Sequence, residues 1–479
     1  MLSTLILEVL AFLSLAIWLA LFFLWGGFWR IWESVADNDR LPDPAHWPPV
    51  TILVPARNEA ASIAPAVAAL ARQDYPGEFS VIVVDDHSED RTAEVARRAA
   101  EESSAAARVE IISAPPLAPG WTGKLWALQA GVAAASGRPD QRPARGELFW
   151  FTDADVVHSL TTLRRLVSRA EHDNLDLASL MVLLESRTFA ERFLIPAFLY
   201  FFLMLYPPNW IADSRSKTAG AAGGSLLLRR SALERIGGFA AIRSEIIDDC
   251  SLARAVKHSG GKIWMRLTRA SRSLRAYSGF AEIRDMISRT AFTQLRYSAL
   301  ELLGTLLGLT ITFLVPVVLT FHRHPLVWLP ALLAWCLMTA SFLPTVAFYR
   351  LAPLWAPALP LSALFYAYAT LLSAIRYWRG RGGQWRVRWS CPAPGLRAPA
   401  KGAHGGTAEQ CASRGARPQP PNPSLARIRG STAADALRRG RAATRPPRGG
   451  PDFGALARAA IDAARSPGRR ALAKRRKRR

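Results

Sequence analysis

The stretch Glu147-Leu148-Phe149-Trp150-Phe151-Thr152-Asp153-Ala154-Asp155 places two carboxylates one residue apart, directly after a run of apolar side chains. An apolar run of this length indicates a buried strand. In extended backbone, residues i and i+2 point to the same side, so Asp153 and Asp155 are expected to aim at one point beyond the strand end. That edge is where open α/β sheets bind their ligands.

Two carboxylates in this position offer oxygen ligands only. Such ligands favour a hard divalent cation, Mg2+ or Mn2+, which would carry phosphate groups. The alternative is that Asp153 and Asp155 begin a loop or cap the helix expected after Ser159. The neighbouring segments are needed to decide between a cation site and a loop.

Strands alternate with helices along residues 50–300, which we expect to form one folded domain. Strands are expected at Val50–Pro55, Phe79–Val84 and Arg108–Ile112, with helices between them. This alternation predicts an α/β fold with a mostly parallel sheet and helices on both faces. The ends of the first two strands carry polar residues, as ligand-binding strand ends do: Arg57, Glu59, Asp85 and Asp86.

Strongly apolar sequence precedes the domain. Residues 1–32 contain no basic residue before Arg30, and their apolar run is longer than the core of a signal peptide. They are therefore expected to form an uncleaved transmembrane helix, followed by a Pro-rich linker at residues 33–49. Positive charge stands on the C-terminal side of this helix, so the domain should face the cytoplasm. The four scattered cysteines show no disulfide or zinc pattern, which fits a reducing compartment.

Residues 301–378 contain three further apolar stretches, about Leu303–Phe321, Leu326–Tyr349 and Leu354–Ile375, each long enough to cross a bilayer. Three crossings would carry the basic segment 379–390 to the side opposite the domain, where Arg-rich segments are disfavoured. We therefore expect two or three C-terminal spans. The part of the last stretch that is rich in proline is the weakest candidate.

A shorter apolar segment, Phe193–Tyr206, lies inside the domain. About 14 residues are too few for a comfortable span. The segment either lies in the membrane interface near a lipid substrate or forms a buried core helix, and the sequence leaves both open.

The tail, residues 391–479, is rich in Arg, Ala, Gly and Pro and has no apolar periodicity, so we expect it to be disordered. It holds 21 Lys or Arg against four Asp or Glu, and thus 17 of the 24 net positive charges of the chain. The basic run 474–479 would suit anionic lipid or nucleic acid. A solvated extension is the simpler explanation, and no nucleic-acid partner is expected.

Taken in order, the motifs of the domain resemble those of membrane-bound family 2 glycosyltransferases, which have the GT-A fold. Their order and spacing match over about Val50–Ser298. The matching segments are Pro55-Ala56-Arg57-Asn58-Glu59, Asp85-Asp86-His87-Ser88, Gly123-Lys124-Leu125-Trp126, Thr152-Asp153-Ala154-Asp155, Gly223-Gly224 and Asp248-Asp249-Cys250. A closer resemblance is to the glycosyltransferases associated with hopanoid biosynthesis. It is carried by Gly120-Trp121-Thr122-Gly123, Leu205-Tyr206-Pro207 and Gln294-Leu295-Arg296-Tyr297-Ser298.

This resemblance implies a nucleotide-sugar-binding domain that transfers a sugar with inversion. The donor is expected to be a UDP-sugar and the acceptor a lipid at the membrane, in hopanoid or related lipid biosynthesis. Mg2+ or Mn2+ on Asp153 and Asp155 would stabilise the leaving diphosphate. Asp249 matches the family position of the catalytic base, and Asp248 is the fallback. Adjacent carboxylates raise each other's pKa, which helps a base near neutral pH.

The same resemblance assigns the other site residues. Those expected to bind the donor are Pro55, Arg57, Glu59, Asp85, Asp86, Lys124, Asp153 and Arg296, and those expected near the acceptor are Gly223 and Gly224. Lys124 has an alternative as an ordinary solvated lysine. Arg296 stands in an altered form of the family's Gln/Arg-x-x-Arg-Trp signature, with Thr293 and Tyr297 at the changed positions. This altered form favours a single transfer over polymerisation.

Three other functions are open at the level of sequence. A polysaccharide-type glycosyltransferase would act on a polyprenyl-linked acceptor. A nucleotidyltransferase would carry a Gly-rich basic loop after the first strand, where this chain has Arg57-Asn58-Glu59. A non-catalytic membrane scaffold would not need every carboxylate at the family spacing. The expected location is the inner membrane of a bacterium, as a multi-pass protein.

Overall fold

The computed structural model describes residues 2–31, 41–103, 106–136 and 146–380. The predicted disordered tail, residues 33–40 of the linker and nearly all of the basic segment 379–390 lie outside these residues. The described part contains one sheet with the strand order β3-β2-β1-β4-β7-β6-β8-β5. Its strands are β1 Val50–Ala56, β2 Phe79–Asp85, β3 Val109–Ser113, β4 Leu148–Phe151, β5 Val156–His158, β6 Leu177–Leu183, β7 Leu226–Arg229 and β8 Ile263–Ser273.

The sheet is mixed, with four parallel and three antiparallel pairs of neighbouring strands, so the prediction of a mostly parallel sheet is correct only in part. β3, β2, β1 and β4 run parallel, as the strand–helix alternation predicts, and β6 is parallel to β8. β7 is antiparallel to both of its neighbours, β4 and β6, and the short β5 is antiparallel to β8. The regular alternation of strand and helix is first broken after β4, because β5 follows it with no helix between them.

Helices cover both faces of the sheet because successive side chains of a strand point to opposite faces. In β1, Ile52 and Val54 pack with α2, α3 and α5. Leu53, between them, packs on the other face with α4, α6 and α9. These helices are α2 Ile63–Ala71, α3 Thr92–Glu102, α4 Gly123–Ser136, α5 Thr162–His172, α6 Phe189–Leu205 and α9 Asp248–His258. The shorter helices of the domain are η1 Ala106–Arg108, α7 Pro208–Ala212, α8 Arg230–Arg235 and η2 Gly238–Ile242.

The helix predicted over residues 1–32 is shorter in the structure, where α1 covers Leu2–Phe23. Gly26 has φ +61°, a left-handed conformation that glycine adopts without strain and that cannot continue a helix. The following turn packs on the domain instead, where Trp25 Nε1 donates a hydrogen bond of 2.9 Å to the carbonyl of Met204.

The end of the domain and the start of the C-terminal apolar region form two helices, α10 (Phe280–Gln294) and α11 (Ala299–Leu309). Arg296 and Tyr297 have φ values of +52° and +58°, and two left-handed residues in succession interrupt the helix.

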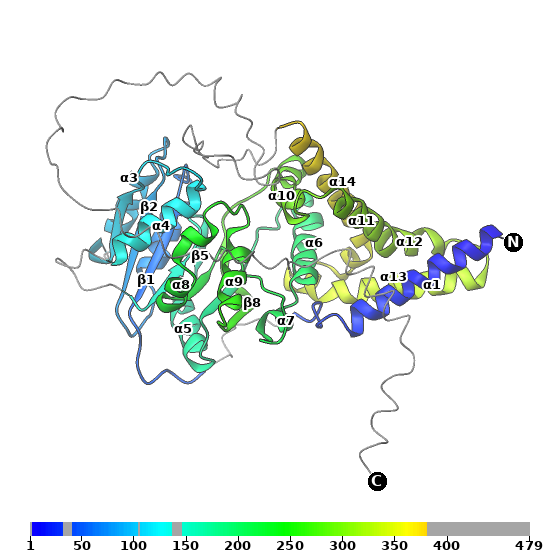
Figure 1. Cartoon of the computed structure of the whole chain (residues 1–479), viewed down its shortest axis with the longest axis horizontal. Helices are drawn as coiled ribbons and strands as arrows, with labels where there is room; N and C mark the ends of the chain where they lie inside the picture. Colours follow the sequence, from blue (N-terminus) through cyan, green and yellow to red (C-terminus); the bar gives the residue numbers. More distant parts are fainter. Residues whose placement is uncertain (1, 32–40, 104–105, 137–145, 381–479) are drawn as a thin grey trace, which may run out of the picture.

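All three C-terminal apolar stretches are helical. Among the residues that the structure describes, four segments are long and apolar enough to cross a membrane, as expected for a membrane protein: Thr4–Phe23, Ala299–Thr320, Pro325–Phe348 and Pro353–Trp378. The elements after α11 are η3 Thr310–Leu314, α12 Val315–Thr320, α13 Pro325–Phe348, η4 Pro353–Ala358 and α14 Leu359–Trp378. Helices α1, α12 and α13 project away from the sheet toward the N-terminus (Figure 1).

Side chains of α1 donate hydrogen bonds to two backbone carbonyl groups of η3. These carbonyls lack a backbone donor within their own helical segment. Pro316 has no N–H, so the carbonyl of Thr312 loses its α-helical partner, and η3 is a π-helical turn. Trp18 Nε1 donates to the carbonyl of Thr312 at 2.7 Å, and Ser14 Oγ donates to that of Ile311 at 3.0 Å. In an apolar environment these bonds are costly to lose.

We predict that Trp18→Phe lowers the free energy of unfolding by about 1–3 kcal/mol, because the carbonyl of Thr312 is left unsatisfied. Thermal unfolding of the detergent-solubilised protein measures this loss. Adding Pro316→Ala should restore most of it, because alanine supplies the missing backbone donor. A Trp18→Phe protein as stable as the wild type, or no rescue by Pro316→Ala, would contradict this explanation.

Candidate functional site

The carboxyl ends of the adjacent strands β2, β1 and β4 meet at one edge of the sheet, as predicted. Beside them, the first turns of α4 and α9 and the segment before β7 complete a pocket of about 350 Å³, its open mouth included. The polar residues that line it are Lys124, Thr152, Asp153, Gly223, Asp248 and Asp249. The fold thus brings residues of four separate sequence motifs into one pocket.

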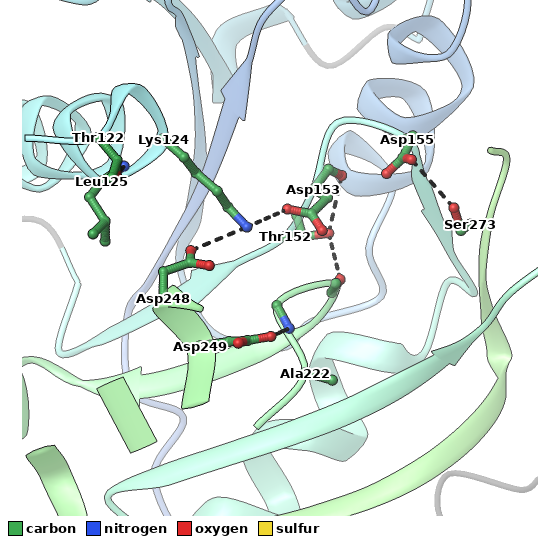
Figure 2. A network of polar contacts seen from close by, with 12 residues as sticks. Thr122, Lys124, Leu125, Thr152, Asp153, Asp155, Ala222, Asp248, Asp249 and Ser273 are labelled. Carbon is green, nitrogen blue, oxygen red and sulfur yellow. Dashed lines mark hydrogen bonds and ion pairs between the residues drawn. The ribbon is translucent and has the colours of Figure 1, made fainter. Parts of the chain in front are cut away.

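Lys124 stands between two of these carboxylates (Figure 2). Its Nζ lies 3.0 Å from Asp153 Oδ1 and 3.3 Å from Asp248 Oδ2, with 40% of its side chain exposed. Desolvation lowers the pKa of Lys124, but the charges of Asp153, Asp248 and Asp249 outweigh it and hold the pKa well above its usual value. The ammonium group is therefore charged at neutral pH, at a position where it could also meet an anionic ligand.

Asp249 is the second residue of α9, and backbone donors hold both of its carboxylate oxygens. The N–H of Gly223 donates to Oδ2 at 2.8 Å, and that of Cys250 donates to Oδ1 at 2.7 Å. Burial and the neighbouring charge of Asp248 raise the pKa of Asp249 to about 6, although Lys124 and the two N–H groups act in the opposite direction. Each oxygen keeps a second lone pair, so the ionised carboxylate can still accept a proton from a ligand in the pocket.

Asp153 and Asp155 do not share one direction. β4 ends at Phe151, and Ala154-Asp155 form a turn, so the alternation of extended backbone does not apply to the pair. Asp153 faces Lys124, whereas Asp155 Oδ2 accepts a hydrogen bond of 3.4 Å from Ser273 Oγ (Figure 2). The expectation that the two carboxylates extend side by side from a strand is therefore wrong.

Asp155 nevertheless lies in a region of excess negative charge. Burial, Asp153 and Glu59 raise the pKa of Asp155 to about 6, against the opposing charge of Arg275. A divalent cation would neutralise this excess, and the oxygen-only ligand set suits Mg2+ or Mn2+. Among the described residues, no three His, Cys, Asp or Glu side chains form a site of their own. An ion on Asp153 and Asp155 would thus need further oxygens from water or a substrate phosphate.

The predicted donor-binding residues of the first two strands cluster at the same sheet edge. Pro55 lines the pocket. Arg57 Nη1 lies 3.3 Å from Asp86 Oδ2, which joins the ends of β1 and β2. Asp85 is buried at the end of β2, where its carboxylate accepts long hydrogen bonds of 3.4 Å from the N–H of Ser88.

Arg296 is not part of the pocket lining. It lies in the turn between α10 and α11, half-exposed, with its guanidinium 4.0 Å from Glu301. The nearby Gln294 binds the domain through Tyr206, since Gln294 Nε2 donates to Tyr206 Oη at 2.8 Å. Tyr206 in turn packs against Gly220, where a Cβ would come within 2.9 Å of the tyrosine ring.

The segment 219–225 is pinned to the sheet by buried side chains. Ser179 Oγ both accepts from the N–H of Ala222 at 2.8 Å and donates to its carbonyl at 3.1 Å. Thr152 Oγ1 donates to the carbonyl of Gly224 at 3.0 Å. These bonds position Gly223, whose N–H holds Asp249, and leave little room beside it. A Cβ on Gly223 would lie 3.3 Å from Lys124 Nζ and 3.4 Å from Asp249 Oδ2.

His158, which belongs to none of the sequence motifs, orients Thr152. Its Nε2 lies 2.8 Å from Thr152 Oγ1, and its Nδ1 lies 2.8 Å from Ser271 Oγ. Since Thr152 gives its own proton to Gly224, it must accept from His158, which fixes the Nε2–H tautomer and makes Ser271 the donor to Nδ1. Burial lowers the pKa of His158 to about 3, so the ring is neutral. A lone histidine outside any motif gives no sequence signal for this role.

We predict that Thr152→Val destabilises the protein by about 1–3 kcal/mol and lowers kcat more than it changes KM for the donor, because Gly224 and His158 both lose their partner. Thr152→Ser keeps the hydroxyl and should behave like the wild type. Thermal unfolding and steady-state kinetics of the two variants test this. Equal behaviour of the valine and serine variants would show that the hydrogen-bonded chain has no positioning role.

Comparison with known proteins gives a match to one family model. The model described as "Glycosyl transferase family 21" matches residues 12–391. Among curated proteins, "Probable glycosyltransferase YdaM" from Bacillus subtilis (strain 168) is 28% identical over 196 residues, which are 40% of this chain and 43% of the relative. The chain therefore spans less than half the length of this relative.

Two solved structures show partial similarity. The mannosyltransferase PcManGT from Pyrobaculum calidifontis, in complex with GDP-Man and Mn2+, has a TM-score of 0.46 and 20% identity, over 77% of this chain and 99% of that chain. Glucosyl-3-phosphoglycerate synthase from Mycobacterium tuberculosis, in complex with phosphoglyceric acid, has a TM-score of 0.31 and 18% identity, over 50% of this chain and 76% of that chain.

Proposed function

The chain belongs to glycosyl transferase family 21, and we propose that it transfers a sugar from a nucleotide-sugar donor to a lipid acceptor at a membrane, with inversion. The prediction of a glycosyltransferase is thereby confirmed. The sequence motifs resemble those of family 2 glycosyltransferases, whereas the family model that matches the chain is that of family 21. The GT-A fold, the inverting mechanism and the lipid acceptor remain parts of this proposal.

The observation that carries the proposal is the placement of Asp249 and Asp153 in one pocket, joined through Lys124 and Asp248. Asp249 is a base with a raised pKa on the α9 side, and Asp153 stands at the strand ends where a diphosphate would lie. This arrangement suits a displacement in which one residue activates the nucleophile and the opposite wall stabilises the leaving group.

In the proposed reaction, Asp249 takes the proton of an acceptor hydroxyl as its oxygen attacks the anomeric carbon. The bond from that carbon to the diphosphate oxygen breaks on the opposite face, which inverts the configuration. The bonding electrons leave with the nucleoside diphosphate. A bound Mg2+ or Mn2+ on Asp153 and Asp155 would supply positive charge against the leaving diphosphate. Lys124 would add a fixed cation beside it.

Of the remaining candidate residues, some would bind the donor and others would lie beside the acceptor. Asp85 and Asp86, at the end of β2, would hydrogen-bond the nucleobase or ribose of the donor, which we propose to be a UDP-sugar. Gly223 and Gly224 would let the acceptor approach the base closely, since neither carries a side chain. We assign the acceptor to hopanoid-type or related lipids on the sequence resemblance alone, and place the domain on the cytoplasmic face of a bacterial inner membrane.

A panel of nucleotide sugars tests this function. The full-length protein, purified in detergent, is incubated with radiolabelled UDP- and GDP-sugars and extracted membrane lipid, with Mg2+, Mn2+ or EDTA. We expect release of nucleoside diphosphate and a labelled lipid, both abolished by EDTA. Release of pyrophosphate would indicate a nucleotidyltransferase instead, and no metal-dependent turnover with any donor would favour a scaffold. Lipid mass spectrometry of a deletion strain should then show one missing glycolipid.

A further inference from the structure

Helix α13 begins beside the N-terminal part of α1 and ends at the catalytic domain. At its start, His324 Nδ1 lies 3.3 Å from Glu8 Oε1, near the N-terminus of α1. At its end, the carbonyl of Phe348 accepts a hydrogen bond of 2.9 Å from Arg269 Nε on β8. The chain therefore returns to the domain before η4 and α14 begin.

Helix α14 does not run antiparallel beside α13; it packs against α10 of the domain. Its first half packs against the start of α10, where the rings of Phe365 and Phe280 are 5.9 Å apart. Its last turn packs beyond the end of α10, where Tyr377 stacks on Tyr297 at 4.4 Å. Between them, Ser373 Oγ accepts from the N–H of Phe292 at 3.1 Å. α14 thus lies beside α10 along its whole length (Figure 1).

The composition of α10 excludes it from the hydrocarbon layer. Its 15 residues include four charged side chains: Glu282, Arg284, Asp285 and Arg289. Charges at the centre of a bilayer are costly on every scale. The partner of one of them is on α14, since Arg376 Nη2 lies 2.8 Å from Asp285 Oδ1. A helix that runs alongside α10 and pairs with its charges cannot cross the bilayer while α10 remains outside.

The outward face of α14 is apolar over its full length. Leu361, Leu364, Tyr368, Leu371 and Trp378 recur at helical spacing and are 38–61% exposed. The same surface continues onto η4, the start of α6 and the start of α10, with exposed Leu354, Phe189 and Phe280. It also adjoins the apolar segment α11–α12, which α14 contacts. Aromatic side chains and terminal arginines on such a stripe are typical of a helix lying in the membrane interface.

We propose that α14 lies in the membrane interface on the side of the catalytic domain, with its apolar stripe against the lipid, and does not cross the bilayer. The chain then crosses three times, with α1, α11–α12 and α13. Of the C-terminal segments, two cross, and the Arg-rich sequence after Trp378 stays on the side of the domain. This removes the conflict between three C-terminal spans and the positive charge that follows them. The inference does not depend on the proposed reaction.

Cysteine labelling in membranes tests the arrangement. In a full-length background with Cys336, Cys391 and Cys411 replaced by alanine, single cysteines are introduced by Arg98→Cys in the domain, Arg323→Cys between α12 and α13, Ala352→Cys before η4 and Arg379→Cys after α14. The native Cys250 is buried and stays. A membrane-impermeant maleimide is applied to intact spheroplasts and, separately, after lysis.

We expect Arg98→Cys, Ala352→Cys and Arg379→Cys to label from one side and Arg323→Cys from the other. Labelling of Arg379→Cys from the side of Arg323→Cys would show that α14 crosses and would overturn the proposal. A nitroxide on Leu364→Cys should lie at headgroup depth, whereas one on Leu333→Cys, exposed on α13, should lie in the hydrocarbon. Equal, deep positions for both labels would also overturn it.

Discussion

Asp249→Asn lowers the rate of sugar transfer by about 10²–10⁴-fold, the range attributed to a lost general base. The amide cannot accept a proton from the acceptor hydroxyl. It also places an N–H₂ group against one of the two backbone donors that the carboxylate satisfies, those of Gly223 and Cys250. Expression, membrane insertion and donor binding should persist, because the substitution keeps the shape of the side chain. Initial rates of the purified variant measure the loss.

The matched control is Asp248→Asn. Asp248 pairs with Lys124. Among the described residues, no backbone N–H donates to the carboxylate of Asp248, so this side chain does not help to position α9. If Asp249 is the base, Asp248→Asn retains most of the activity. If Asp248 takes the proton instead, the two variants exchange their effects. Wild-type activity in Asp249→Asn would exclude it as the base.

The pH dependence of the rate separates catalysis by Asp249 from a structural role. With a pKa of about 6, Asp249 is protonated and inactive as a base below that pH, so kcat/KM should fall there by about tenfold per pH unit. The negative charge of Asp248 raises this pKa, so Asp248→Asn should shift the acid limb to lower pH. A purely structural Asp249 would leave the acid limb of the profile unmoved by Asp248→Asn.

The local pattern of the sequence predicts the first half of the sheet because its strands are unbroken apolar runs. β8 is the longest strand described, but the sequence pattern does not predict it, because Arg266, Arg269 and Arg272 interrupt its run of apolar residues. The structure accommodates two of these arginines over aromatic rings: Arg266 lies 5.7 Å from the centroid of Trp264, and Arg269 lies 5.0 Å from that of Phe348. Such partners are visible only once the chain has folded.

The same holds for the site: sequence motifs indicate candidate residues, but they do not predict the contacts between residues far apart in the sequence. The resemblance of the sequence motifs to those of glycosyltransferases selects Asp153 and Asp249, and both residues line the pocket. The contacts of Lys124 with Asp153 and Asp248 depend on how α4 and α9 pack on one sheet face, which no local pattern contains. Likewise, the hydrogen bond between His158 and Ser271, which helps to orient Thr152, joins residues 113 positions apart. Arg296, chosen by motif, lies instead beside Glu301.

Asp153→Ala and Asp155→Ala should each lower transfer by about 10²–10³-fold or more, the cost of losing one group that stabilises a developing negative charge. The reason is electrostatic. The proposed diphosphate gains charge as it leaves, and without either carboxylate a divalent cation has too few ligands to stay beside it. Asp213→Ala is the surface control, because Asp213 pairs only with the exposed Arg215 among the ion pairs of the described residues.

A readout independent of turnover decides whether these carboxylates bind metal. In the wild type, Mn2+ together with a nucleoside diphosphate should raise Tm, since both bind the folded state. Asp153→Ala and Asp155→Ala should abolish the contribution of Mn2+, whereas Asp249→Asn, which lies on the acceptor side, should keep it. Undiminished Mn2+ stabilisation in Asp153→Ala would place the cation elsewhere. In that case Asp153 would act through its ion pair with Lys124, and Lys124→Met would reproduce its loss of activity.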